Sequence, residues 1–564
     1  MRANEQRDSG PSARAAVWRL AVAALLTLSF APGSFFAQVL GAREPGPPAA
    51  TTPDTSPGNE KAAGAARPNV LVIASDDHAA YVLGVDGDTQ VRTPALDRLA
   101  GQGLYFRRAY ANSPVCTASR QSLLTGRYPR TIGVTQLRTP LPASELTLAE
   151  MLAAAGYRTA AIGKMHFNSE LTHGFQKRID LADFRRLRAA AGLAPPGSPR
   201  DLPADAGPVL GLWRPFADPA RVWLNSEVLP YAAAEADMPA TFLAEQAIGW
   251  LAEQTGEEPF FLMVSFYEPH SPFHFPLEYR GRHDPAAFEV PPVDADDEPQ
   301  VPAIFRDLSR SEKQGIIAAY YTSVEFLDAS VGRVLAALDD EGLAETTLVV
   351  YLGDHGYMLG QHGRFEKHCS FEPAIRAPLM LRWPGRIPQG RQSAALVELV
   401  DLVPTILEAC HIPIPPPVQG RSFWPLATAA TVATDAHRAA VVVEYAENEE
   451  ALIRTERYKL VYCTGRRERE DGYTTGLPLP GRTIRLYDLE ADPEERRDLA
   501  GRDDARIAAL IDELLDDLLA HLVATARQPE LLPRAGRLEL IDFCLAPRDV
   551  SREEALGEAI EASP

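Results

Sequence analysis

The stretch Pro68-Asn69-Val70-Leu71-Val72-Ile73-Ala74-Ser75-Asp76-Asp77 is a short apolar run that ends in two adjacent carboxylates. A continuous apolar run of this length is typical of a β-strand that is buried on both faces, as in a parallel sheet. A helix is predicted from Thr93-Pro94, where a capping residue precedes a proline, and glycines at 101 and 103 stop it. The sequence therefore predicts a strand followed by a covering helix.

The same alternation of helix and strand recurs along the chain. Further helices are predicted over residues 147–155, 239–254 and 316–338, and further buried strands over 159–162, 260–266 and 347–352. Helices that alternate with buried strands indicate an α/β fold, with a large, mainly parallel sheet sandwiched between helices.

Polar clusters follow these predicted strands directly. They are Asp76-Asp77, Lys164-Met165-His166, Glu268-Pro269-His270 and Asp354-His355. In sheets of this type, ligands bind beyond the carboxyl ends of the strands. We therefore expect the four clusters to lie together at one edge of the sheet.

A cysteine and an arginine mark the segment Ser113-Pro114-Val115-Cys116-Thr117-Ala118-Ser119-Arg120. The following residues have helix-forming composition, so Cys116 lies near a predicted helix N-terminus, where free N–H groups and the helix dipole favour negative charge. Arg120 lies four residues later on the same helix face. This spacing favours a nucleophile and a cation in one site, although a free cysteine is more often a small buried apolar residue.

The pattern Cys116-Thr117-Ala118-Ser119-Arg120, with Thr125-Gly126-Arg127 after it, resembles the signature of the type I, formylglycine-dependent sulfatases of the alkaline phosphatase-like superfamily. The resemblance implies that a formylglycine-generating enzyme oxidises Cys116 to an aldehyde, whose hydrate is the nucleophile. Many members have proline where Ala118 stands, but alanine also occurs in the family.

Three carboxylates, Asp76, Asp77 and Asp354, are candidate metal ligands. Hard oxygen ligands of this kind favour Ca²⁺, or Mg²⁺, over softer metals. Asp354-His355-Gly356 resembles the second metal-binding segment of the family, so the resemblance implies an ion held by Asp76, Asp77, Asp354, His355 and the modified Cys116. Histidine at 355, where many sulfatases have asparagine, resembles the branch of choline sulfatase, iduronate sulfatase and the phosphonate monoester hydrolases.

The remaining candidate catalytic residues also rest on the resemblance. Together with Cys116 they are Arg120, Lys164, His166, His270 and Lys367. The metal and the cations would stabilise charge on the oxygens of a transferring sulfuryl group. His270 or Lys367 would protonate the leaving alcohol, and His166 would take the proton that allows sulfate to depart.

Composition and charge exclude several classes of protein. Of 564 residues, 46% are hydrophobic and 23% charged, which is typical of a globular protein. The 76 acidic and 56 basic side chains give a net charge of -20, which argues against a nucleic-acid binder.

Arginines at 2, 7, 14 and 19 precede an uncharged run over 20–42, as in an export signal, so we expect a periplasmic or secreted protein. An uncleaved N-terminal membrane anchor is the alternative.

Five regions are predicted along the chain: a signal peptide or anchor (1–42), a flexible linker (43–67), a catalytic domain (68–425), a C-terminal subdomain (426–525) and a C-terminal tail (526–564). In the subdomain, short strands over 440–445, 451–454, 458–463 and 485–489 precede a helix whose apolar face runs from 507 to 522. This order predicts a small antiparallel sheet packed against one helix. Of the five cysteines, those other than Cys116 are available for disulfides in an exported protein.

The predicted function is hydrolysis of a sulfate ester, of a carbohydrate or a small organic alcohol, to the alcohol and inorganic sulfate. The alternatives are a phosphonate monoester or phosphodiester hydrolase of the same superfamily, and a non-catalytic exported protein with the same fold. Long proline-rich loops over 184–230 and 275–305 are candidates for setting specificity. Trp213 and Trp223, with Arg214 and Arg221, either contact a sulfated sugar or anchor these loops to the core.

Overall fold

The computed structural model describes residues 67–557, except 196, 199, 201, 203, 204 and 430–435. The predicted signal peptide, and the predicted linker up to residue 66, lie outside the described residues. Among the helices of the described part, none combines the length and apolar character that a membrane span requires. All five cysteines are buried and free of disulfides.

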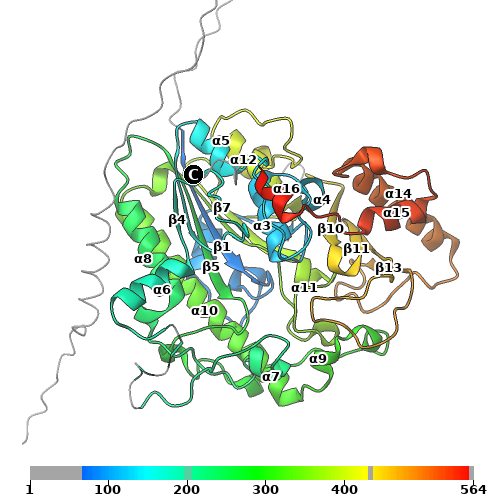
Figure 1. Cartoon of the computed structure of the whole chain (residues 1–564), viewed down its shortest axis with the longest axis horizontal. Coiled ribbons are helices and arrows are strands. Elements are labelled where there is room, and N and C mark those ends of the chain that lie inside the picture. The colour runs from blue at the N-terminus through cyan, green and yellow to red at the C-terminus, as the bar shows by residue number, and fades with distance from the viewer. Residues whose placement is uncertain are drawn as a thin grey trace, which may run out of the picture.

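A large sheet forms the centre of the molecule (Figure 1). Its order in the described chain is β4-β3-β5-β1-β6-β7-β2-β8, with β9 paired to β2. The strands are β1 (Asn69–Asp76), β2 (Leu104–Tyr110), β3 (Arg158–Gly163), β4 (Lys177–Ile179), β5 (Phe260–Pro269), β6 (Thr347–Gly353), β7 (Arg376–Arg382), β8 (Arg391–Ser393) and β9 (Val397–Glu398). Only β7 runs antiparallel to its neighbours, β6 and β2. The predicted mainly parallel sheet is confirmed.

The central strand β1 packs on both faces, as its apolar run predicted. Leu71 and Ile73 lie in one hydrophobic core, and Val70 and Val72 lie in the other. Helices cover the two faces (Figure 1). Those that contribute to the first core are α2 (Pro94–Gly101), α6 (Leu181–Ala190), α8 (Pro239–Ala252) and α10 (Arg310–Asp340), and those that contribute to the second are α3 (Cys116–Thr125), α5 (Leu148–Ala154) and α12 (Leu402–Ala409).

Two helices of the first layer are joined by a buried carboxylate. The side chain of Asp328, in the middle of α10, accepts hydrogen bonds from Leu96 N at 2.8 Å and Ala95 N at 3.1 Å. These are free amide groups in the first turn of α2, whose N-cap residue Thr93 makes no side-chain cap. Asp328 therefore caps α2 from a neighbouring helix.

A second, smaller sheet follows the large one. It is fully antiparallel, in the order β10 (Ala440–Tyr445), β11 (Glu450–Thr455), β12 (Tyr458–Cys463), β13 (Thr483–Asp488). Leu514, Leu518 and Leu522 on one face of α14 (Ala505–Ala524) pack in its core, together with residues of α15 (Arg537–Leu545). The predicted small sheet with a packed helix is confirmed.

Short helices complete the described chain. They are α4 (Pro129–Ile132), α7 (Ala220–Trp223), α9 (Ala303–Arg306), α11 (Glu372–Ile375), α13 (Trp424–Thr428) and α16 (Arg552–Leu556). The last of these, α16, follows α15 in the chain, and its Ala555 O accepts from Ala143 N at 2.7 Å. The C-terminal segment thus contacts the part of the chain that carries the large sheet.

Candidate active site

The four polar clusters meet at one edge of the large sheet. Strands β3, β5, β1 and β6 are consecutive neighbours and run parallel. Their register places Ser75 opposite Gly353 and Asp76 opposite Pro269, so the strands end at the same level. The residues that follow the strands therefore share one space.

Cys116 lies at the centre of this space. It is the first residue of α3 and is 1% exposed. Its Sγ lies 3.1 Å from His355 Nε2, 3.3 Å from Lys367 Nζ and 3.4 Å from Asp76 Oδ1. Side chains from three separate segments thus contact one sulfur atom.

The carboxylates and His355 form a set of atoms that fits a divalent cation. One ligand atom each from Asp76, Cys116, Asp354 and His355 lies within 4.8 Å of the others, and Asp77 belongs to an overlapping group with Asp76, Cys116 and His270. All three aspartates are 1% exposed or less. Asp77 has a φ of 66°, and its backbone N donates to Asp354 Oδ1 at 3.1 Å. Several buried carboxylate oxygens around one point are the donors that Ca²⁺ and Mg²⁺ prefer.

Three cationic side chains balance the three carboxylates. Lys164 forms an ion pair with Asp76, and Lys367 Nζ lies 2.5 Å from Asp77 Oδ1. Arg120 is fully buried, and its guanidinium donates to Asp354 Oδ2 at 2.8 Å, Lys164 O at 2.7 Å, Ser265 Oγ at 2.6 Å and Ser75 O at 3.3 Å. Arg120 thereby joins three strands and fixes the carboxylate of Asp354.

Burial and these cations act in opposite directions on the acids. Burial alone would raise the pKa of Asp76, but Lys164 and the other basic neighbours hold it well below its usual value. For Asp77, burial outweighs the nearby Lys367 and the pKa is raised. Burial would also raise the pKa of the Cys116 thiol, yet the surrounding cations leave it lowered. The site thus favours negative charge at position 116.

The three predicted site histidines differ in their surroundings. Burial would lower the pKa of His355, but Asp354 and Cys116 raise it to about 9. Burial lowers the pKa of His270 to about 4, although its side chain is 33% exposed and is the most open of the cluster. Burial, followed by Lys164, lowers the pKa of His166 to about 3, and its Nδ1 has no hydrogen-bond partner. Among the described residues, the His166 side chain makes no hydrogen bond to the cluster, although Lys164 and Arg120 lie close enough to act on its pKa.

Some residues of the site were not predicted from the sequence. Ser265 receives a hydrogen bond from Arg120 and interrupts the apolar run at the start of β5. That isolated hydroxyl was a usable signal. Tyr320, on α10, donates to Asp77 O at 2.5 Å and accepts from Ala79 N, which holds the turn after β1. Nothing in the helical pattern around Tyr320 distinguishes it from a core tyrosine.

The loop tryptophans anchor loops to the core. Trp223 is 2% exposed within the first hydrophobic core, and Trp213 packs against the same core. Arg214 pairs with Asp218, and Arg221 pairs with Glu312. Of the two interpretations given for these residues, the anchoring one is the better supported.

Comparison with known proteins adds two family matches. The Sulfatase family model matches residues 68–412, and the model "N-sulphoglucosamine sulphohydrolase, C-terminal" matches residues 360–523. A protein named "Sulfatase" from Formosa agariphila is 30% identical over 378 residues, which span 61% of this chain and 69% of that protein. The "N-acetylglucosamine-6-O-sulfatase" of Bacteroides thetaiotaomicron is 25% identical over 487 residues, which span 77% of this chain and 83% of that protein.

Solved structures support the same fold. The phosphonate monoester hydrolase of Agrobacterium radiobacter superposes with a TM-score of 0.68 at 24% identity, covering 83% of this chain and 97% of that one. At this level of identity the likeness concerns the fold alone.

Proposed function

The chain belongs to the sulfatase family and is a sulfuric ester hydrolase, and we propose that its substrate is the sulfate ester of a carbohydrate or a small organic alcohol. The single observation that carries the proposal is the convergence of Lys367, His355 and Asp76 on the Sγ of Cys116. A pocket that gathers cations around one candidate nucleophile suits an anion whose charge is spread over several oxygens. The relative named N-acetylglucosamine-6-O-sulfatase supports a carbohydrate ester.

We further propose that Cys116 is converted to formylglycine by a formylglycine-generating enzyme, and that Asp76, Asp77, Asp354 and His355 hold a Ca²⁺ ion, with Mg²⁺ as the alternative. The buried carboxylate oxygens described above fit either ion. A bound divalent cation would supply Lewis-acid stabilisation of negative charge on the ester oxygens. Residue 116, as an aldehyde hydrate, would supply one hydroxyl that attacks sulfur and a second whose deprotonation expels sulfate and restores the aldehyde.

The chain's own cations would hold the sulfuryl group. Lys367 Nζ is 3.3 Å from Sγ of Cys116, and Lys164 is bound to the neighbouring Asp76. Both ammonium groups stay charged, because the facing carboxylates raise their pKa values despite the opposing effect of burial. Arg120 is fully buried and orients the carboxylate of Asp354 through a hydrogen bond.

Two side chains are candidates to protonate the leaving alcohol, and the geometry favours Lys367 over His270. His270 Nδ1 lies 2.8 Å from Ser271 O, and a carbonyl oxygen can only accept, so Nδ1 carries the proton in the neutral ring. That leaves Nε2 of His270 as an acceptor, whereas the ammonium of Lys367 keeps N–H groups to donate. His166, with Nδ1 unpartnered, is free to accept the proton that the second hydroxyl gives up.

Export is proposed on the sequence alone. The arginines of the first 19 residues and the uncharged run that follows are typical of an export signal, either cleaved or retained as an anchor. Fractionation of cells that express the full chain, with N-terminal sequencing of the product, tests both versions.

The test of function uses purified full-length chain and two matched ester series. Aryl sulfates and sulfated monosaccharides should be hydrolysed, with release of inorganic sulfate, and the Cys116→Ala variant should be inactive. Mass spectrometry of the peptide that contains residue 116 should show the aldehyde in place of the thiol. Faster hydrolysis of an aryl phosphonate monoester than of the matched aryl sulfate would instead favour the phosphonate hydrolase, and an unmodified thiol in an inactive protein would favour the non-catalytic alternative.

A further inference from the structure

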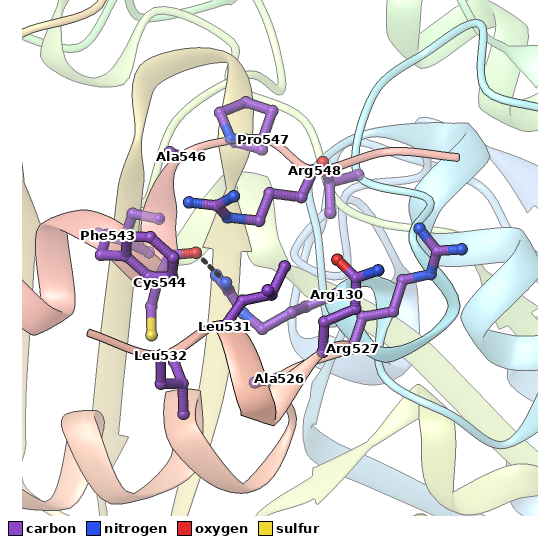
Figure 2. Close-up of a pocket in the computed structure, with 14 residues that line it drawn as sticks. Arg130, Ala526, Arg527, Leu531, Leu532, Phe543, Cys544, Ala546, Pro547 and Arg548 are labelled. Atoms are coloured by element: carbon purple, nitrogen blue, oxygen red, sulfur yellow. Dashed lines mark hydrogen bonds between the residues drawn. The ribbon is translucent and has the colours of Figure 1, made fainter. Parts of the chain in front are cut away.

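The end of the described chain lies beyond both family matches and yet contacts the catalytic part of the fold. The matches stop at residue 523, whereas the C-terminal tail, residues 526–557, carries α15 and α16. Val550 N donates to Gly133 O at 2.9 Å, and Ala143 N donates to Ala555 O at 2.7 Å. Arg130 of α4 donates to Cys544 O, and the pocket in Figure 2 lies at this junction. The tail is therefore attached on both sides of residues 134–142.

One carboxylate of the tail binds the loop between these attachments. We call residues 135–139 the rim loop. Asp549 accepts from Thr135 N at 3.0 Å, from Gln136 N at 2.9 Å, from Thr135 Oγ1 at 2.5 Å and from Thr139 Oγ1. A single side chain thus accepts from two backbone amides and two hydroxyls of a five-residue loop.

The rim loop in turn contacts the segments that carry Cys116 and His166. Leu137 O accepts from Thr117 Oγ1 at 2.6 Å, next to Cys116. Leu137 O and Thr139 O accept from Asn168 Nδ2 at 3.0 and 2.9 Å, two residues beyond His166. The loop is therefore hydrogen-bonded to both segments, one residue beyond the candidate nucleophile and two residues beyond the candidate base.

Side chains of the rim loop are open to solvent at this position. Leu137 is 43% exposed, and Arg138 is also exposed. On its other side, Gln136 Nε2 lies 3.3 Å from Glu447 Oε1, and Glu447 pairs with Arg467 of the loop before β13. The rim loop thus joins the catalytic domain to the small subdomain beside the buried cluster.

We propose that Asp549 is a positioning residue that fixes the rim loop as the wall facing the alcohol part of the ester, so that substrate selection depends on the C-terminal tail. The inference rests on the proposed function. The buried cations would hold the sulfuryl group, so the alcohol part has to extend towards solvent, and the rim loop offers the exposed side chains of Leu137 and Arg138 one hydrogen bond away from the residue after Cys116. A loop without anchors loses conformational entropy when it contacts a ligand, which weakens binding. Because Asp549 already fixes the rim loop before the ligand binds, that entropic cost is lower.

The test compares Asp549→Ala with wild type in steady-state hydrolysis of an aryl sulfate and a sulfated monosaccharide. KM should rise by at least about tenfold for one or both esters, while the inhibition constant of inorganic sulfate stays within about twofold, because sulfate contacts only the buried cluster. Asp549→Asn keeps one acceptor oxygen and should give an intermediate KM. If Asp549 only stabilised the fold, the Asp549→Ala variant would contain fewer folded, active molecules. The apparent kcat would then fall, and KM would stay unchanged.

Glu554→Ala is the matched control, since Glu554 lies in the same tail but pairs with Arg527 and does not contact the rim loop. It should leave both KM values unchanged. If Asp549→Ala does not fold, Thr139→Val removes one hydrogen bond from the loop side and should raise KM in the same direction. If the wild type is active and these variants keep its KM, the inference is overturned. If the wild type hydrolyses no sulfate ester, the proposed function is overturned.

Discussion

Replacement of Lys459 by methionine should destabilise the chain more than any exposed charge change in the same hairpin. Lys459 lies on β12 and is fully buried. Its Nζ forms an ion pair with Glu495, donates to Ser370 O at 2.8 Å and lies 3.5 Å from Glu372 Oε1. Glu372 N also donates to Glu495 Oε2 at 2.6 Å. One ammonium group thus lies between the buried carboxylate of Glu495 and the partly buried carboxylate of Glu372.

The size of the stability loss depends on the carboxylates that lose the ammonium group of Lys459. Burial would raise the pKa of Glu372, but Lys459 and Arg454 hold it lowered, and the pKa of Glu495 is raised by burial despite Lys459. Removing one partner of a buried ion pair costs about 3–5 kcal/mol, since the remaining charge has no compensation. Methionine keeps the length and apolar stem of lysine, so lost packing adds little. Lys459→Met should therefore lower the free energy of unfolding by about 3–5 kcal/mol.

Urea unfolding followed by circular dichroism measures the effect. Arg457→Met is the control, because Arg457 lies in the same hairpin but is half exposed and pairs with Asp488 at the surface, so it should change stability far less than Lys459→Met. Adding Glu495→Gln to Lys459→Met removes one of the two stranded charges and should recover part of the loss. Equal stability of the Lys459 and Arg457 variants would refute the reasoning.

Cys116→Ala should lower kcat by a factor on the order of 10⁴ or more while the thermal midpoint stays close to that of wild type; turnover near the normal rate would contradict the site assignment. Dialysis against EDTA should abolish hydrolysis of an aryl sulfate, and added Ca²⁺ or Mg²⁺ should restore it; activity indifferent to chelation would count against the metal. Burial raises the pKa of Asp328 from 3.8 to about 7, so the folded chain keeps a proton that the unfolded chain loses, and stability should fall as pH rises from about 4 to 7. Asp328→Asn should flatten that decline in the urea midpoint; an identical slope in both proteins would show that Asp328 does not cause it.

The fold was predictable where burial dominates the sequence. β1 and β6 are uninterrupted apolar runs, and β12 has the bounds that the sequence predicted. β2 and β7 were not predicted, although both lie inside the large sheet. β2 contains the adjacent Arg107 and Arg108, which interrupt its apolar run, and its pairing with β7 shifts register there. Because two adjacent charged residues at a bulge break the apolar pattern, β2 is not recognised as a strand from the sequence.

The site was predictable to the extent that its members follow strands. Asp76, Lys164 and Asp354 each come after one, and the parallel sheet brings them together. Partners outside that rule were not predicted. Ser265 is 145 residues from Arg120, and Asp549 is 414 residues from Thr135, so the sequence pairs neither residue with its partner, although the Ser265 hydroxyl does interrupt the apolar run of β5.

The enclosure of Cys116 also constrains biosynthesis. Its sulfur is covered by Asp76, His355 and Lys367, which lie 40, 239 and 251 residues away in the chain, and 1% of the residue is exposed. If Cys116 is oxidised by a second protein, as proposed above, these side chains would block that protein from the thiol once the chain has folded. We therefore expect oxidation to take place on the nascent or translocating polypeptide, so that a folded molecule that has missed the modification stays permanently without it.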